Sequence, residues 1–171
     1  MPEHNLLESP LFIENAGLVL CWPFIPQLFN MAKIDGLKEP DQASRAVHLL
    51  QYLVNNQSNT SEHELPLNKI LCGIDLTTPI NPEIILTASE TELCNQLLFS
   101  MTQNWPQMSN SSTESLQASF LQRKGKLTES EAYWLLQVEK KSYDLLLQTL
   151  PWQLSPIIFS WMDKKIEIDW T

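Results

Sequence analysis

The sequence predicts an α+β fold with a helical N-terminal two-thirds and a small strand-rich C-terminal part. Two segments, residues 43–54 and 88–105, repeat apolar side chains at helical spacing. After Gly125 short runs rich in β-branched and aromatic residues replace that pattern, and residues 166–170 alternate with a period of two. At 171 residues the chain is most simply one domain, with a loose leader over residues 1–12 and a single domain over residues 13–171.

Residues 11–29 form the most apolar stretch of the chain, and we expect them to cross the core. The Asn-Ala-Gly step at residues 15–17 allows a tight turn between two buried pieces. Pro23 and Pro26 fit the first turn of a short helix that continues to Phe29, because proline is tolerated where the backbone amide would be unpaired.

The helix over residues 43–54 follows a loop marked by Gly36 and Pro40, and Asp41 is its expected N-cap. Residues 55–64 are rich in Asn, Ser and Thr, which is typical of an exposed loop. A two-turn helix is then expected over residues 65–73. Its first turn contains Pro66, and Gly73 ends it.

The second long helix begins at a capping-box pattern, Thr87-Ala88-Ser89-Glu90, in which the hydroxyl and the carboxylate bind amides that the first turn leaves unpaired. Residues 75–83, with two prolines, form the connector before it, and Pro106 stops it. Residues 108–115 are another polar loop, and residues 116–122 are expected to form a short helix.

The C-terminal part is expected to contain strands at residues 133–139, 157–161 and 166–170. A short helix over residues 142–150 separates the first two, and Pro151 ends that helix. The pattern does not define which strands pair.

The charge of the chain excludes some partners. The net charge of −9 argues against nucleic acid, which binds clustered Lys and Arg. The basic clusters at residues 123–126, 140–141 and 164–165 are short, and we interpret them as turn and surface residues. Only 18% of residues are charged, against about 25% in ordinary globular chains, and six are Trp, so we expect a partner to cover part of the surface.

Cys21, Cys72 and Cys94 are widely spaced, without a CxxC pair or a nearby His at zinc-ligand spacing. Each lies in an apolar run, where a free thiol behaves as a small buried hydrophobe. This usage fits a reducing compartment, and we expect no disulfide scaffold and no metal. The N-terminus lacks the pattern of a signal peptide, and no run reaches the ~20 apolar residues of a membrane span. We therefore expect a cytoplasmic protein without membrane insertion.

The helix over residues 43–54 has two faces. One is apolar, and Arg45, His48 and Tyr52 lie opposite. Arg, Tyr and His combine rigid area with directed hydrogen bonds, so this face is a candidate contact surface. The alternative is an ordinary solvated helix surface.

The motifs of common enzyme classes are absent. With four Gly the chain has neither GxGxxG nor GxxxxGK[ST]. A small hydrolase or transferase using His48 with Cys72 or a carboxylate would need these groups to converge in a cleft, and no catalytic signature surrounds them. We therefore predict a protein without enzymatic activity and without a cofactor.

Several runs together resemble the conserved module of contractile injection system tape measure proteins. In the first half they are IENAGLVL (13–20), PFIPQLF (23–29), RAVHLLQYL (45–53) and LNKILCG (67–73). In the second half they are FLQRKG (120–125), WLLQVE (134–139), DLLL (144–147), LPW (150–152), WM (161–162) and Trp170. The similarity runs from about Ile13 to Trp170 in the family's order.

The resemblance implies a non-enzymatic assembly protein of a phage-tail-like particle, found in the bacterial cytoplasm or inside the assembled particle. Such proteins set the length of the tube and sheath, and their globular part is expected to engage hub, spike, tube or baseplate subunits. Even a fully helical chain of this size would span only roughly 250 Å at ~1.5 Å per residue, so docking is the expected role here rather than measuring. An assembly chaperone for a baseplate subunit is the alternative.

Six side chains are the candidate partner contacts: Arg45, His48, Tyr52, Asn68, Lys69 and Arg123. For Asn68 and Arg123 the alternative is a structural role, as helix caps or in internal hydrogen bonds.

Overall fold

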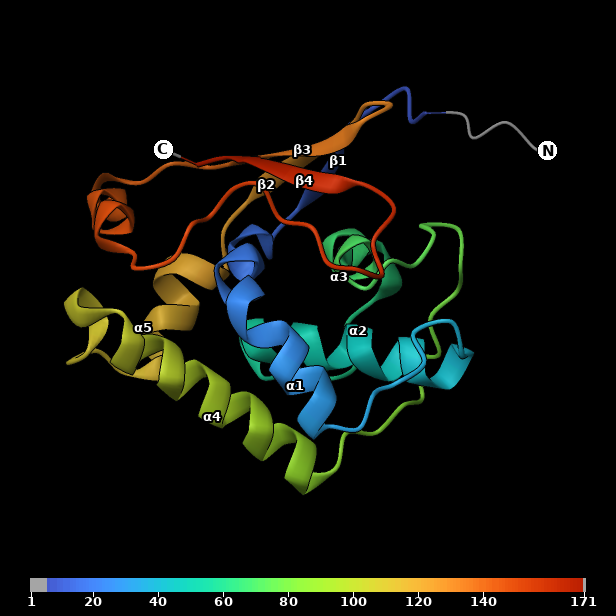
Figure 1. The fold of residues 1–171 in the computed structure, drawn as a ribbon, viewed down its shortest axis with the longest axis horizontal. Helices are drawn as coiled ribbons and strands as arrows, with labels where there is room; N and C mark the ends of the chain where they lie inside the picture. The colour runs from blue at the N-terminus through green and yellow to red at the C-terminus, as the bar shows by residue number, and fades with distance from the viewer. Residues whose placement is uncertain (1–5, 171) are drawn as a thin grey trace.

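The computed structural model describes residues 6–170 as two layers, a sheet with helices against one of its faces (Figure 1). The sheet draws three of its four strands from the C-terminal third, and the preceding part of the chain is mainly helical. The predicted α+β class and the division into a helical part and a strand-rich part are therefore confirmed. None of the helices described is long and apolar enough to cross a membrane.

The sheet has the order β1-β2-β3-β4, and its strands are β1 (Leu11–Ile13), β2 (Gly125–Glu129), β3 (Tyr133–Val138) and β4 (Lys165–Asp169). The first two pairings are antiparallel, and β3 and β4 are parallel. One row across the sheet is Leu11, Leu127, Leu136 and Ile168, which faces the helices. The adjacent row, Phe12, Lys126, Gln137 and Asp169, lies on the other face because side chains alternate along a strand.

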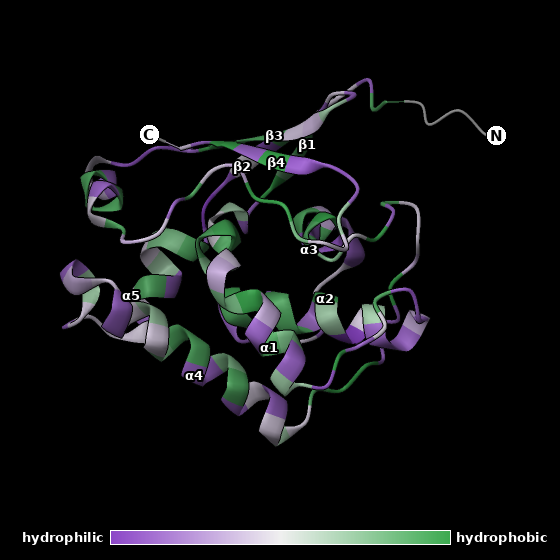
Figure 2. Cartoon of the chain, viewed as in Figure 1, coloured by the Kyte–Doolittle hydropathy of each residue, from purple (hydrophilic) through white to green (hydrophobic). Residues whose placement is uncertain are grey.

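The helical layer contains short and long elements. The α-helices are α1 (Ile25–Met31), α2 (Pro40–Asn55), α3 (Pro66–Leu71), α4 (Ala88–Asn104) and α5 (Thr113–Leu116). The shorter turns are η1 (Ala16–Phe24), η2 (Glu62–Glu64), η3 (Pro106–Met108), the π-helical η4 (Gln117–Leu121) and η5 (Ser142–Thr149). The hydropathy colouring shows the apolar residues of η1 and α2 in the middle of the molecule, beneath the sheet (Figure 2).

The apolar stretch at residues 11–29 crosses the core as expected. Every residue from Ala16 to Cys21 is buried in η1, and α1 follows with Pro26 in its first turn. The chain enters η1 from β1, so a piece of the N-terminal segment becomes an edge strand of the C-terminal sheet. That strand was not predicted, because three residues are too few to show a period-two pattern.

The helix ends mostly follow the predicted signals. Thr87 and Glu90 form the capping box at the start of α4, and Gly73, with a φ of +68°, follows α3. The expected cap of α2 is wrong, because the N-cap is Glu39 and not Asp41. Pro40 occupies the first helical position, so the extended residue before it is placed to accept a hydrogen bond from the Gln42 amide.

Two C-terminal expectations are corrected. Residues 157–161 do not form a strand, since Ile157 makes a single bridge to Ile166 and the chain then turns. Pro156 cannot donate a backbone hydrogen bond, and the chain turns at residues 160 and 161, where the rings of Phe159 and Trp161 stack at 4.8 Å. The basic run at residues 123–126 is not a surface turn, because Arg123 is buried and β2 begins at Gly125.

The expected leader falls partly on residues 1–5, which lie outside the described residues. Its last two residues, Leu11 and Phe12, pair with Leu127 and Lys126 in the sheet and are therefore not loose. The division into a leader and one domain otherwise stays a prediction.

Candidate functional site

The polar face of α2 is covered by the chain's own residues 75–87. His48 is 1% exposed, and its Nε2 lies 2.9 Å from the carbonyl oxygen of Asn81. The Asn81 amide in turn donates to the Ser44 hydroxyl at 2.9 Å. The expected exposure of His48 is therefore wrong, because the connector folds back over the helix.

Two residues of that face still reach the surface. The Arg45 side chain is 27% exposed and pairs with Glu90 at 2.6 Å, which ties α2 to the first turn of α4. Tyr52 is half-buried against the core. A role of Arg45 and Tyr52 in partner binding stays a prediction.

Lys69 is buried, and its side chain binds the segment of residues 75–87 that covers α2. Its Nζ donates to the carbonyl oxygens of Leu76 and Thr78 at 3.1 and 2.8 Å and lies 3.6 Å from Glu62 Oε2. The other oxygen of Glu62 accepts a hydrogen bond from the amide of Ile80. The Lys69 ammonium therefore donates hydrogen bonds to two backbone carbonyls and lies beside one carboxylate, and its side chain is only 4% exposed.

Asn68 belongs to a buried amide cluster that joins three segments. Asn15 donates to Gln51 Oε1 at 2.9 Å and to Asn68 Oδ1 at 2.7 Å. Asn68 donates to the carbonyl oxygen of Val47 at 3.1 Å. The cluster fixes η1, α2 and α3 relative to one another, which agrees with the structural alternative for Asn68.

Arg123 forms a buried, bidentate ion pair with Asp144. Nη1 and Nη2 lie 2.8 and 2.6 Å from the two carboxylate oxygens, so the two planar groups meet side by side. The remaining N–H groups donate to the carbonyl oxygens of Ser119 and Glu139. Arg123 thereby joins η4, the end of β3 and η5, and its role is internal.

Aromatic rings surround this ion pair. The guanidinium carbon lies 5.6 Å from the ring centre of Phe120 and 5.3 Å from those of Tyr143 and Trp170. The indole N–H of Trp170 donates to Asp144 Oδ2 at 3.1 Å. Rings at these distances attract the cation and keep water away. Each charge is therefore stabilised mainly by its counter-charge and not by water.

Two opposing effects act on the pKa of Asp144. Burial would raise it, but hydrogen bonds from Arg123, the Lys141 amide and Trp170, with the charge of Arg123, lower the pKa below its usual value. The folded state therefore favours the carboxylate.

This shift predicts an acid-dependent loss of stability. A carboxyl whose pKa is lower in the folded state stabilises the fold above its unfolded pKa of about 3.9, and that contribution is lost as the pH falls through the folded value. Urea denaturation at pH 7 and pH 3 should show a smaller stability difference between wild type and Asp144→Asn at the lower pH. The exposed variant Glu131→Gln is the control. An unchanged difference for Asp144→Asn would show that its carboxylate is not favoured by folding.

The proposed Cys–His pair has an unsuitable environment. Cys72 is a buried free thiol, and burial raises its pKa. Burial also raises the pKa of Cys94 to about 12. Nucleophilic catalysis needs a thiolate, which these surroundings disfavour. Among residues 6–170 no group of His, Cys, Asp and Glu side chains is placed to hold a metal ion.

A cavity of about 530 Å³ lies between the loop after α3 and the hairpin of β2 and β3. Lys164, in its wall, donates to Glu129 Oε2 at 2.9 Å and to the Ser130 carbonyl at 2.8 Å. The Thr77 hydroxyl and amide both donate to Asp75 Oδ1, which is the arrangement of a turn. These contacts stabilise loops and assemble no nucleophile with a base.

Sequence reasoning missed the partners of its candidates. Asp144 and Trp170 complete the Arg123 cluster, Glu90 pairs with Arg45, and Asn15 and Gln51 pair with Asn68. One signal was present, since Asn15 is a polar residue inside the most apolar run of the chain. A buried amide in such a run needs a partner.

A family model described as contractile injection system tape measure protein matches residues 3–170, nearly the whole chain. Neither the curated proteins nor the solved structures contain a match.

Proposed function

The chain belongs to the contractile injection system tape measure protein family, and from this premise we propose that it acts as a docking module. In this proposal it binds hub, spike, tube or baseplate subunits through side-chain contacts and catalyses no reaction. The family is structural rather than catalytic, which agrees with a role in particle assembly.

The proposal rests on the shape of the fold. The longest helix among residues 6–170 is α4, whose 17 residues span about 26 Å at ~1.5 Å per residue. The remaining helices are shorter and pack with α4 beneath one sheet, so this part of the chain offers surfaces instead of a rod (Figure 1). Setting the length of a tube needs an extended element, whereas docking needs a shaped surface.

Co-purification tests the proposal directly. A tagged copy of the chain is expressed in cells together with the surrounding particle genes, and the bound proteins are identified by mass spectrometry. Recovery of hub, spike, tube or baseplate subunits is the expected result. A monomeric chain without any of them would overturn the docking role. Absence of the chain from purified mature particles, despite such binding, would identify an assembly chaperone.

The double variant Arg45→Ala with Tyr52→Ala tests the surface residues of α2. If they contact a partner, we expect binding to weaken by about tenfold or more, since Arg and Tyr are frequent interface anchors. The matched control removes a basic residue and a tyrosine that face each other on the sheet, Lys165→Ala with Tyr133→Ala. Both proteins should retain the circular dichroism spectrum of wild type, and equal binding by all three would remove α2 from the interface.

A further inference from the structure

We propose that the groove between α1 and α4 is the docking site for an amphipathic helix of another particle subunit. The stripe that this helix inserts is apolar and carries no charge. The inference rests on the proposed docking function and assigns it a surface and a kind of partner.

One wall of the groove belongs to the end of η1 and to α1. It consists of Phe24, Gln27, Leu28 and Met31, which are spaced as one face of a helix over two turns. Met31 is 51% exposed although it is a large apolar residue. This wall therefore presents apolar surface that the chain itself does not cover.

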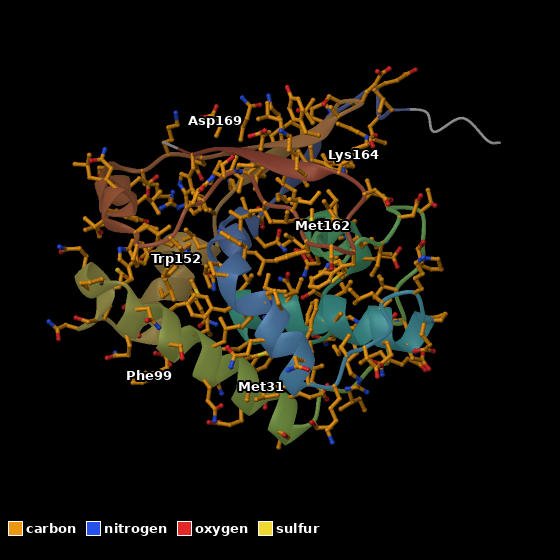
Figure 3. All side chains as sticks on the ribbon, viewed as in Figure 1. Met31, Phe99, Trp152, Met162, Lys164 and Asp169 are labelled. Atoms are coloured by element: carbon orange, nitrogen blue, oxygen red, sulfur yellow. The ribbon has the colours of Figure 1, made fainter. Side chains whose placement is uncertain are left out.

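The opposite wall has the same spacing. It consists of Leu93, Gln96, Leu97 and Ser100 on α4, again two turns of one helix face. Phe99 does not line the groove, but it lies on the same helix and is 59% exposed. Met31 and Phe99 both lie on the side of the molecule away from the sheet (Figure 3).

The charge pattern distinguishes this face from the rest of the molecule. None of the residues that line the groove is charged, in a chain with a net charge of −9, and the neighbouring carboxylate of Glu92 accepts a hydrogen bond from Gln96 Nε2 at 3.5 Å. The outer face of the sheet carries Lys126 on β2 and Lys165 and Glu167 on β4. Charged residues are depleted in the buried centre of protein interfaces. An uncharged groove is complementary to an uncharged stripe, because a carboxylate or ammonium would lose water there without gaining a partner.

The dimensions of the groove suit a helix with one large apolar anchor. Two walls of two turns each accept two turns of a third helix, which would present anchors at positions i, i+3 or i+4, and i+7. The hollow measures about 170 Å³, and cavities of about 150 Å³ in proteins hold a benzene molecule. It therefore has room for one anchor such as leucine or phenylalanine. Gln27, Gln96 and Ser100 would face Ser, Thr, Asn or Gln at the edges of the stripe.

Photo-crosslinking locates the partner. The photoreactive residue benzoylphenylalanine replaces exposed Gln96 in the full chain, and in a control protein it replaces exposed Thr128 on the outer face of the sheet. Both are expressed with the particle genes, irradiated and analysed by peptide mass spectrometry. We expect position 96 to crosslink to a helical segment of a hub, spike, tube or baseplate subunit with an uncharged apolar stripe.

Charge placed in the groove tests its energetic role. The variant Gln27→Glu with Gln96→Glu adds two carboxylates to the walls with almost no change in shape. Gln103→Glu with Gln107→Glu makes the same change at exposed positions that do not line the groove. The first pair should weaken binding of the crosslinked subunit by about tenfold or more, and the second by less than about twofold.

The outcomes separate the site from the function. If subunits co-purify but position 96 gives no crosslink and both glutamate pairs bind equally, the groove is not the docking site and the docking function stands. A crosslink from position 96 to a second copy of this chain would replace the partner helix with self-association. If no subunit co-purifies with wild type, the proposed function and this inference both fail.

Discussion

Replacing Arg123 by methionine should lower the free energy of unfolding by about 3–5 kcal/mol, because Asp144 remains buried without its counter-charge. The pair is bidentate, and three aromatic rings surround the guanidinium. A methionine side chain fills part of the space but donates no hydrogen bond. The Glu139 carbonyl also loses the hydrogen bond from Arg123, and the Ser119 carbonyl is left with the one from the Tyr143 hydroxyl, which adds to the cost.

Chemical denaturation at pH 7 measures this loss. Lys126→Met is the matched control, because it removes a basic residue of β2 on the outer face of the sheet and should change stability by less than about 0.5 kcal/mol. The double variant Arg123→Met with Asp144→Leu removes both charges and should recover part of the loss. A loss below about 1 kcal/mol for Arg123→Met would show that the buried ion pair is not needed for the fold.

The local parts of the fold could be predicted because their signals lie close together in the chain. Thr87 and Glu90 are three residues apart and determine the start of α4 through two hydrogen bonds. Gly73 follows α3 with the positive φ that glycine tolerates best. Pro40 was expected in the loop before α2 but is its first residue, and Glu39 is the cap, since the pattern did not distinguish a proline in a loop from one in the first helical turn.

The candidate site could be predicted only in part, because its contacts join distant segments. Helical periodicity placed Arg45, His48 and Tyr52 on one face, and it holds no information about what lies over that face. The cover is a polar, proline-containing connector that is held through backbone atoms of Leu76, Thr78 and Asn81. Contacts made by backbone atoms do not depend on residue type and leave no pattern in the amino-acid sequence. The burial of His48 could therefore not be predicted from the sequence.

Arg123 shows the same limit for charged residues. It stands beside Lys124 in a short basic run, which is typical of a surface turn. Its carboxylate partner is 21 residues further along, and Trp170 follows 26 residues after that. The sequence contains many acidic residues at similar separations, and only the packing of η4, η5 and β4 selects Asp144.

Replacing Gly17 by alanine should destabilise the fold by about 3 kcal/mol or more, because the added methyl group meets backbone atoms that cannot move away. Its Cβ would lie 1.7 Å from the carbonyl oxygen of Phe120 and 2.6 Å from the Cα of Leu121. The substitution would separate η1 from η4. Since η1 continues into α1, the proposed groove against α4 would be displaced as well.

Gly36→Ala is the matched control, because the nearest atom to its new Cβ is Glu39 Cβ at 3.7 Å, an ordinary contact distance. That variant should change stability by less than about 1 kcal/mol. Urea denaturation of both variants gives the comparison, and equal midpoints would show that η1 and η4 do not approach as closely as described. A large loss for Gly17→Ala alone would establish that a residue without a side chain allows the apolar N-terminal segment to pass through the core, and thereby positions the helix that forms one wall of the docking groove.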